Sequence, residues 1–277
     1  KNRRQHKKMH INAEKEEPTG SFQFEEVAFT PKALSDARIK VLWDKWGLDQ
    51  NSYMKRLSFD EFFSEEQKDV FIRDLFSSPN ARKSLGVSTG RNNSWGGIGP
   101  LTSFSATELT STVTNLEFFS KINDLEHPTV VREKGALTKC FDEFVEGVTL
   151  SDELRKLLVM EESEHYMEFS EEQRREFIFH LFRRICIGGG MCQYEDEITP
   201  YLDATRGLYK DLVSVQKNPS TKALEVTSMV YKLEEAEGEW GSLFPGGASQ
   251  EHSFCYLIVE PIKRYVTVWY LAHTPMF

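Results

Sequence analysis

Three absences narrow the classes of protein to which this sequence can belong. No run of eighteen apolar residues occurs, so no segment is predicted to cross a membrane and no membrane partner is expected. No hydrophobic stretch follows the basic N-terminal residues, so we expect no secretory signal. The 277 residues contain only four scattered cysteines, too few for a disulfide framework, which favours a reducing compartment such as the cytosol.

The common catalytic and metal-binding motifs are also missing. The sequence has no His-Glu-x-x-His, no His-x-Asp and no Cys-x-x-Cys pair, so a zinc protease, an iron oxygenase or a structural zinc site would lack its ligands. Gly188–Gly190 follow a predicted helix, whereas a phosphate-binding loop follows a strand and ends in Lys-Ser/Thr. The sequence therefore predicts no catalytic residue, no cofactor and no metal ion.

An enzyme whose site forms only in the folded chain is the remaining catalytic hypothesis. Cys192 is the best nucleophile candidate, because a following helix N-terminus would lower its pKa. The acidic run Glu195–Glu197 opposes this, since nearby negative charge disfavours a thiolate. His180, in a helix with an apolar face, is expected to have a packing role. An approach of His180 or His252 to Cys192 would favour an enzyme.

The charge of the chain is negative and uneven. The net charge is −9, and five Lys or Arg fall within the first ten residues, so the rest of the chain stands at −14. An acidic body argues against nucleic-acid binding, which relies on basic surface to displace phosphate counterions. We expect residues 1–20 to be a disordered basic leader.

Residues 170–215 are predicted to form a helical hairpin. Ser170 and Gln173 have the spacing of a capping box, and apolar residues follow at intervals of three and four. Gly188–Gly190 should end the first helix, because glycine adopts the left-handed conformation that other residues avoid. Thr199 is expected to cap the second helix, with Pro200 in its first turn.

The C-terminal part, residues 223–273, is predicted to be extended. Segments 224–233, 254–259 and 265–272 are rich in β-branched and aromatic residues, and Pro261 lies in the connection between the last two. Three antiparallel strands should form a sheet on which the helices pack. We therefore predict an α+β fold, with residues 21–277 as a single domain and helices packed on a C-terminal antiparallel sheet.

The N-terminal half is predicted to contain two helices and a long loop. A helix should run from Thr30 to Trp46, and a second over about 59–76, with a possible division at a capping box that starts at Ser64. Residues 77–115 are rich in Gly, Ser, Thr and Asn, which predicts a long loop that is either functional or partly disordered.

Three aromatic features are candidates for partner contact, because aromatic residues are enriched at interface hot spots. They are Trp95 in the long loop, the pair Trp43 and Trp46, and an exposed strand over 265–270 that could accept an added strand. For Trp43 and Trp269 the core is the simpler interpretation. The acidic runs 161–164 and 195–197 could dock a partner or could be solvated helix-start charges.

Several segments together resemble the cilia- and flagella-associated protein 300 family. The residues that carry the resemblance are Ser151–Arg155, Gly188–Asp196, Thr199–Leu202, Tyr209–Pro219 and Ile258–Ile262. The basic leader and the acidic stretch 234–239 depart from the family pattern. The resemblance offers no catalytic residues to carry over.

The resemblance implies a non-enzymatic protein of the cytoplasm and of the motile cilium or flagellum, acting in assembly or delivery of outer and inner dynein arms. Expected partners are axonemal dynein assembly factors, dynein chains and the intraflagellar transport machinery. A stable structural component of the axoneme is the alternative.

Overall fold

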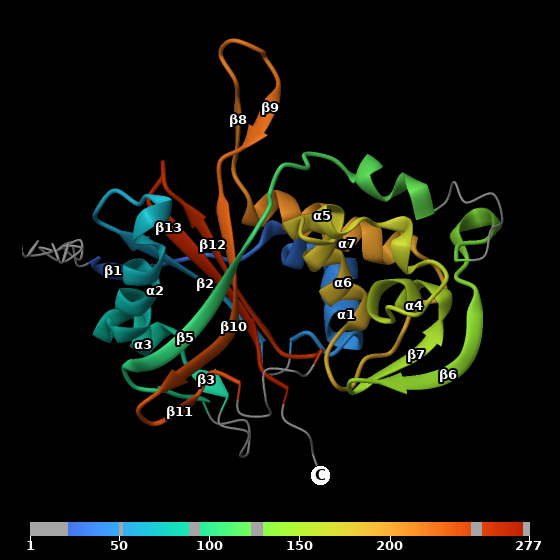
Figure 1. Cartoon of the computed structure of the whole chain (residues 1–277), viewed down its shortest axis with the longest axis horizontal. Helices are drawn as coiled ribbons and strands as arrows, with labels where there is room; N and C mark the ends of the chain where they lie inside the picture. Colours follow the sequence, from blue (N-terminus) through green and yellow to red (C-terminus); the bar gives the residue numbers. More distant parts are fainter. Residues whose placement is uncertain (1–21, 50–51, 89–94, 123–129, 245–250, 274–277) are drawn as a thin grey trace, which may run out of the picture.

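The computed structural model describes residues 22–49, 52–88, 95–122, 130–244 and 251–273. A seven-stranded sheet runs through the middle of this part of the chain, and every strand pair in it is antiparallel (Figure 1). Its order is β1 (Phe24–Val27), β2 (Ser52–Phe59), β13 (Tyr265–Leu271), β12 (Phe254–Glu260), β10 (Met229–Gly238) and β11 (Gly241–Ser242), with β5 (Leu101–Leu109) also paired to β10.

The last two predicted C-terminal strands are confirmed as β12 and β13, at the centre of the sheet, but the first differs: Leu224–Val226 lies in a separate hairpin, and β10 covers Met229–Gly238. β12 and β13 pair from Phe254↔Leu271 to Glu260↔Tyr265, and the connection between them includes Pro261. All seven residues of β12 are buried. A continuous apolar strand of this kind is typical of a sheet covered on both faces.

The first covering layer consists of helices, and the predicted packing of the helical hairpin on the sheet is confirmed. Phe254, Tyr256 and Ile258 of β12 belong to the same buried cluster as the helices. The principal helices of this layer are α1 (Ala37–Lys45), α4 (Glu153–Val159), α6 (Phe177–Ile187) and α7 (Thr199–Leu212), which lie together on one side of the sheet (Figure 1).

The second covering layer lies on the opposite face and was not predicted. It contains α2 (Lys68–Ser77) and α3 (Pro79–Ser84), while Cys255, Leu257 and Val259 of β12 supply the sheet side of its cluster. Phe71 is its centre, with ring centroids 4.8–5.2 Å from four other phenylalanines. Alternate residues of one strand therefore belong to two separate cores, as the two-residue period of a strand requires.

The helical hairpin differs from its prediction in two details. The capping box of Ser170 and Gln173 is present, but it starts a single turn, α5 (Glu171–Arg174), and the chain bends before α6. Gly188 has φ +69° and ends α6 as predicted. The expected cap from Thr199 is wrong: Ile198 occupies that position, with no side-chain hydrogen bond, and Pro200 lies in the first turn.

The N-terminal helices are shorter than predicted. The segment from Thr30 contains a 3-10 turn, η1 (Lys32–Ser35), and Asp36 then caps α1 by accepting from the Arg38 amide. Residue 59 ends a strand rather than starting a helix. The capping box at Ser64 is confirmed and opens η2 (Glu65–Gln67), which leads into α2. Phe62, which falls within the predicted second helix, is exposed.

The predicted long loop over 77–115 is largely wrong. The segment holds α3, the short strands β3 (Val87–Ser88) and β4 (Trp95–Gly96), and β5. β5 pairs along most of β10, from Leu109↔Val230 to Leu101↔Gly238. Because β5 alternates small polar residues with few apolar ones, its strand depends on this pairing with a distant segment, which composition does not reveal.

Two further hairpins lie outside the main sheet. β6 (Lys139–Val145) pairs with β7 (Val148–Asp152), and β8 (Val215–Lys217) pairs with β9 (Leu224–Val226). The β8–β9 hairpin projects from the body (Figure 1). The other described elements are the 3-10 turns η3 (Leu116–Ile122), η4 (Glu133–Gly135) and η5 (Tyr166–Glu168).

The division into a leader and one domain over 21–277 stays a prediction, and the leader 1–20 lies outside the described residues. In the ranges that the structure describes, no helix has both the length and the apolar character needed to cross a membrane.

Candidate interaction site on the helical layer

A fully buried ion pair anchors the helical layer. Asp152 caps α4 by accepting from the Arg155 amide at 3.0 Å, and its other oxygen accepts from the Arg155 guanidinium. Nη2 of Arg155 donates to the Cys186 carbonyl and to the Tyr201 hydroxyl, both at 2.7 Å. The guanidinium also lies 3.4 Å from the Tyr194 ring centroid. One cation thus links α4 to the end of α6 and the start of α7.

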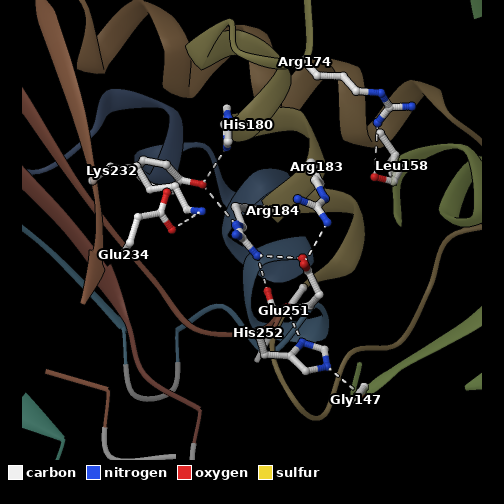
Figure 2. A network of polar contacts seen from close by, with 12 residues as sticks. Gly147, Leu158, Arg174, His180, Arg183, Arg184, Lys232, Glu234, Glu251 and His252 are labelled. Carbon is white, nitrogen blue, oxygen red and sulfur yellow. Dashed lines mark hydrogen bonds and ion pairs between the residues drawn. The ribbon is translucent and has the colours of Figure 1, made fainter. Parts of the chain in front are cut away.

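A second polar network lies on the other side of α6, where two arginines share one carboxylate (Figure 2). Arg183 Nη2 lies 2.8 Å from one oxygen of Glu251, and Arg184 Nη1 lies 3.2 Å from the other. Arg184 also donates from Nε to the Tyr256 hydroxyl at 3.1 Å. Burial opposes ionisation of Glu251, but Arg184 and Arg183 outweigh it and lower the pKa of this carboxyl.

Arg174 extends this positive surface without a carboxylate partner among the described residues. Its Nη2 donates to the carbonyl of Leu157 at 2.8 Å and also to that of Tyr166, over whose ring the guanidinium lies at 3.5 Å. Burial lowers the pKa of Arg174 to about 10. The Nε atoms of Arg174 and Arg183 are buried and have no hydrogen-bond partner among the described residues.

Arg174 and Arg183, but not Arg184, line a cleft of about 630 Å³ between α4, the α5–α6 bend and the β6–β7 turn. Arg174, Arg175 and Arg183 carry the positive charges of its lining. The other polar, aromatic and apolar residues that line it are Val145, Glu146, Leu158, Val159, Met160, Glu161, Glu162, Tyr166, Phe179, His180 and Glu251. The cleft therefore combines cations, exposed acids and an apolar surface.

The three residues of the enzyme hypothesis do not form one site among the described residues: Cys192 and His252 both lie against Gly188, and His180 lies elsewhere. His180 lines the cleft and its Nδ1 lies 3.2 Å from the Tyr256 hydroxyl, whereas neither Cys192 nor His252 lines it. Cys192 packs against Gly188, and burial raises the pKa of its thiol to about 12, which leaves it protonated at neutral pH. In the described ranges no hydrogen bond joins Cys192 to a histidine.

His252 instead ties two turns together. Its Nδ1 lies 3.0 Å from the Gly188 carbonyl, and its Nε2 lies 3.1 Å from the Gly147 carbonyl (Figure 2). It therefore holds the end of α6 to the turn between β6 and β7. Among the residues that the structure describes, no three His, Cys, Asp or Glu side chains gather in a way that could hold a metal ion.

The predicted aromatic contact surfaces are mostly interior. Trp43 and Trp46 are buried, and Trp46 stacks on Tyr201 with ring centroids 4.9 Å apart. The strand over 265–270 is not exposed: β13 lies between β12 and β2 and cannot accept an added strand. Core packing of Trp43 and Trp269 is confirmed. The side chain of Trp95 lies outside the described part of the chain.

The acidic runs divide into two kinds. Glu195 pairs with Lys45 at 2.7 Å, and Asp196 pairs with Lys139 at 2.9 Å. This run therefore contacts the end of α1 and the start of β6. Glu161 and Glu162 are exposed and line the cleft. Asp196 and Glu197 are also exposed, so both runs have side chains open to solvent, but Glu161 and Glu162 border the cleft.

Sequence reasoning missed a group of exposed apolar side chains on projecting elements. Phe141 and Phe144 of β6 are 94% and 75% exposed, although a Phe in a strand is usually taken as core. The other large exposed apolar residues of this kind are Met167 beside the cleft, Val215 and Leu224 on the β8–β9 hairpin, and Trp240. Nothing in the sequence pattern distinguishes these exposed apolar residues from apolar residues that are buried.

The comparisons with a family model and with known relatives point to the same family. The family model described as Cilia- and flagella-associated protein 300 matches residues 21–271. A relative with that name from Chlamydomonas reinhardtii is 35% identical over 244 residues, which is 88% of this chain and 94% of the relative. One from Paramecium tetraurelia is 34% identical over 235 residues, 85% of this chain and 87% of the relative. No solved structure matches the chain.

Proposed function

Because the chain belongs to the cilia- and flagella-associated protein 300 family, we propose that it acts without catalysis in the assembly or delivery of outer and inner dynein arms. In this role it supports ciliary motility, works in the cytoplasm and in the motile cilium or flagellum, and binds dynein chains, their assembly factors or the intraflagellar transport machinery. The observation that carries the proposal is the family match over residues 21–271, which spans both layers of the fold.

Two features of the surface support a role in binding proteins. Phe141 and Phe144 are exposed on the β6 strand, and exposed aromatic side chains are enriched where proteins meet. The β6–β7 turn also lines the cleft that holds Arg174 and Arg183. Two exposed aromatic side chains and a charged cleft therefore lie near each other on one side of the molecule.

The proposal is tested in ciliated cells. The full-length protein, recovered from the cytoplasm, should bring down axonemal dynein chains or their assembly factors. Axonemes that regrow after its deletion should lack both outer and inner arms in cross-section. Recovery of none of these proteins, together with intact arms after deletion, would overturn the proposal.

A double substitution on β6 tests whether this strand forms part of the surface that binds dynein proteins. Phe141→Ser with Phe144→Ser should reduce the recovered dynein proteins by about thirtyfold or more, because loss of a hot-spot aromatic costs of the order of 1–2 kcal/mol, or about 2–4 kcal/mol for the two. Phe62→Ser is the matched control, since Phe62 is also exposed but lies on the opposite layer. Equal recovery with both variants would remove β6 from the binding surface.

The alternative, a stable component of the axoneme, predicts a different fractionation. A structural component remains in axonemes after extraction with high salt, in constant ratio to tubulin. A delivery factor is depleted from the extracted axoneme and is concentrated in the cell body.

A further inference from the structure

One edge of the main sheet is open along β5. In the described ranges, β5 is the last strand on its side of the sheet and pairs with β10 alone. Successive residues of a strand direct their N–H and C=O groups to opposite edges, so alternate backbone groups of β5 point away from β10. Just beyond the strand, Thr110 exchanges backbone hydrogen bonds with Arg175 and Phe177. The open part of the edge is therefore 101–107.

The two ends of the sheet differ in how well they are protected. β1, at the other end, has only four residues, and two of them are the exposed acids Glu25 and Glu26. Short length and charge both discourage another strand from adding to an edge. Residues 101–107 of β5 include no charged residue and no proline. This edge thus lacks the charges and the proline that usually prevent edge pairing.

A groove of about 440 Å³ runs beside the open edge. Leu101–Ala106 line it together with Lys68, Asp69 and Arg73 of α2, the helix that lies next to β5 (Figure 1). Side chains of successive strand residues alternate between the two faces of a sheet, so a groove lined by six successive residues follows the edge of the strand. The groove has the position that an added strand would occupy.

The lining of this groove is complementary to itself. Asp69 and Arg73 are exposed, carry opposite charges and lie four residues apart, which places them on the same side of α2. In a two-fold contact between identical surfaces, Asp69 of each copy can pair with Arg73 of the other. Because residues 101–107 are uncharged, pairing this strand with itself also brings no like charges together.

We propose that β5 pairs with β5 of a second copy of this chain, antiparallel and across a two-fold axis, so that two sheets continue as one. A pairing centred on Phe104 stays within 101–107 and places Ser103 of each copy opposite Ser105 of the other. Both serines are exposed. The proposal is independent of the ciliary role, so either can fail without the other.

Sedimentation equilibrium of the full chain tests whether it self-associates. Over a concentration range of about 1–100 μM the average mass should rise from that of one chain toward that of two, as mass action requires. A chain that is still monomeric at the highest concentration would overturn the proposal.

A double substitution on β5 tests which surface makes the contact. Ser103→Lys with Ser105→Lys should raise the dissociation constant of the dimer at least about tenfold, because the introduced lysines would face each other across the axis. The matched control is Gln216→Lys with Ser220→Lys, which adds the same charge at exposed residues of the β8–β9 hairpin and should leave the constant unchanged. Equal dissociation constants for the two double variants would contradict pairing through β5.

A charge exchange on α2 tests the two-fold arrangement without altering the strand. Asp69→Arg and Arg73→Asp should each weaken self-association about threefold or more, because like charges then meet across the axis. An equimolar mixture of the two variants should recover the association of the parent, since each supplies the charge that the other needs. Thermal unfolding confirms that each variant is folded. A mixture that associates no better than the separate variants would overturn the two-fold arrangement.

Discussion

The two faces of the sheet are covered in different ways. The layer of α2 and α3 packs almost entirely through apolar side chains around Phe71, whose ring contacts four other phenylalanines. The layer of α4, α6 and α7 also has an apolar core, but it contains the buried pair Asp152–Arg155 and the cluster around Glu251. The stability of one layer thus depends on the close packing of apolar side chains. The stability of the other depends on such packing and also on paired charges.

Because of this difference, the two layers should respond differently to substitution of their buried residues. An apolar core tolerates swaps that conserve volume, because its contacts are non-directional. A buried ion pair is sensitive to loss of either partner, because the remaining charge has no water to solvate it. The charged layer should therefore be the less tolerant of the two, and it is also the layer that presents the cleft.

The largest effect is expected from breaking the buried ion pair. Arg155→Met conserves volume but leaves Asp152 without its cation, so we expect a loss of about 3–5 kcal/mol in the free energy of unfolding. Urea denaturation of the purified chain measures it. Asp152→Asn combined with Arg155→Met should recover part of the loss; a single variant as stable as the parent would refute the charge-dependence of this layer.

A smaller loss is expected at the end of α6. Gly188→Ala places a Cβ 2.6 Å from the Trp46 carbonyl oxygen and 2.5 Å from the Cys192 sulfur, at a residue with φ +69°. Left-handed backbone strain and the clash together should cost about 2–3 kcal/mol. The control is Gly147→Ala, whose φ is also positive but whose Cβ would meet no neighbour within 4 Å, so only the backbone strain remains. Equal losses in thermal unfolding would show that packing around Gly188 is unimportant.

On the apolar face, a conservative swap should be tolerated. Phe71→Leu keeps an apolar side chain at the centre of the phenylalanine cluster, so we expect a loss of about 1 kcal/mol, and no more than about 1.5. The same urea titration used for Arg155 allows direct comparison. A loss as large as that of Arg155→Met would erase the distinction between the two faces.

The last effect concerns pH. Burial, and then Arg184, Lys232 and Arg183, lower the pKa of His180 well below 6.5. Below pH 6.5 the unfolded chain binds a proton at this residue while the folded chain does not, so stability should fall as the pH decreases.

The slope should be at most about 1.4 kcal/mol per pH unit between pH 6.5 and 5. His180→Gln should flatten this part of the stability profile measured by urea unfolding. An unchanged slope in the variant would show that the pKa of His180 is the same in the folded and the unfolded chain.

The elements that were predicted correctly are those for which the local sequence pattern and the packing in the folded chain favour the same conformation. β12 and β13 are continuous runs of β-forming residues, and Gly188 follows directly on the apolar face of α6. The strand β5 was read as a loop because its small polar residues have no strand signal of their own, and pairing with β10 determines its conformation. The second layer was missed because an apolar strand does not indicate which distant helix covers each face.

The candidate site was hardly predictable. Asp152 and Arg155 lie three residues apart, so their pairing is open to sequence reasoning, but the full burial of the pair is not. Glu251 reaches Arg183 only in the folded chain. The sequence pattern gives no sign that Phe141 is exposed, and none of the elements that the structure describes covers its side chain. The glutamates 161 and 162 were identified as possible docking residues, and the structure places them at the cleft.

The most direct measurement of the proposed function is where the protein resides while cilia regrow. Cells that express the tagged full-length chain are deciliated, and the tag is quantified in the cell body, in the detergent-soluble ciliary fraction and in salt-extracted axonemes over time. We expect a large cytoplasmic pool and a soluble ciliary fraction that peaks during regrowth and then declines. Accumulation in the salt-extracted axoneme in constant ratio to tubulin would contradict a role in assembly or delivery.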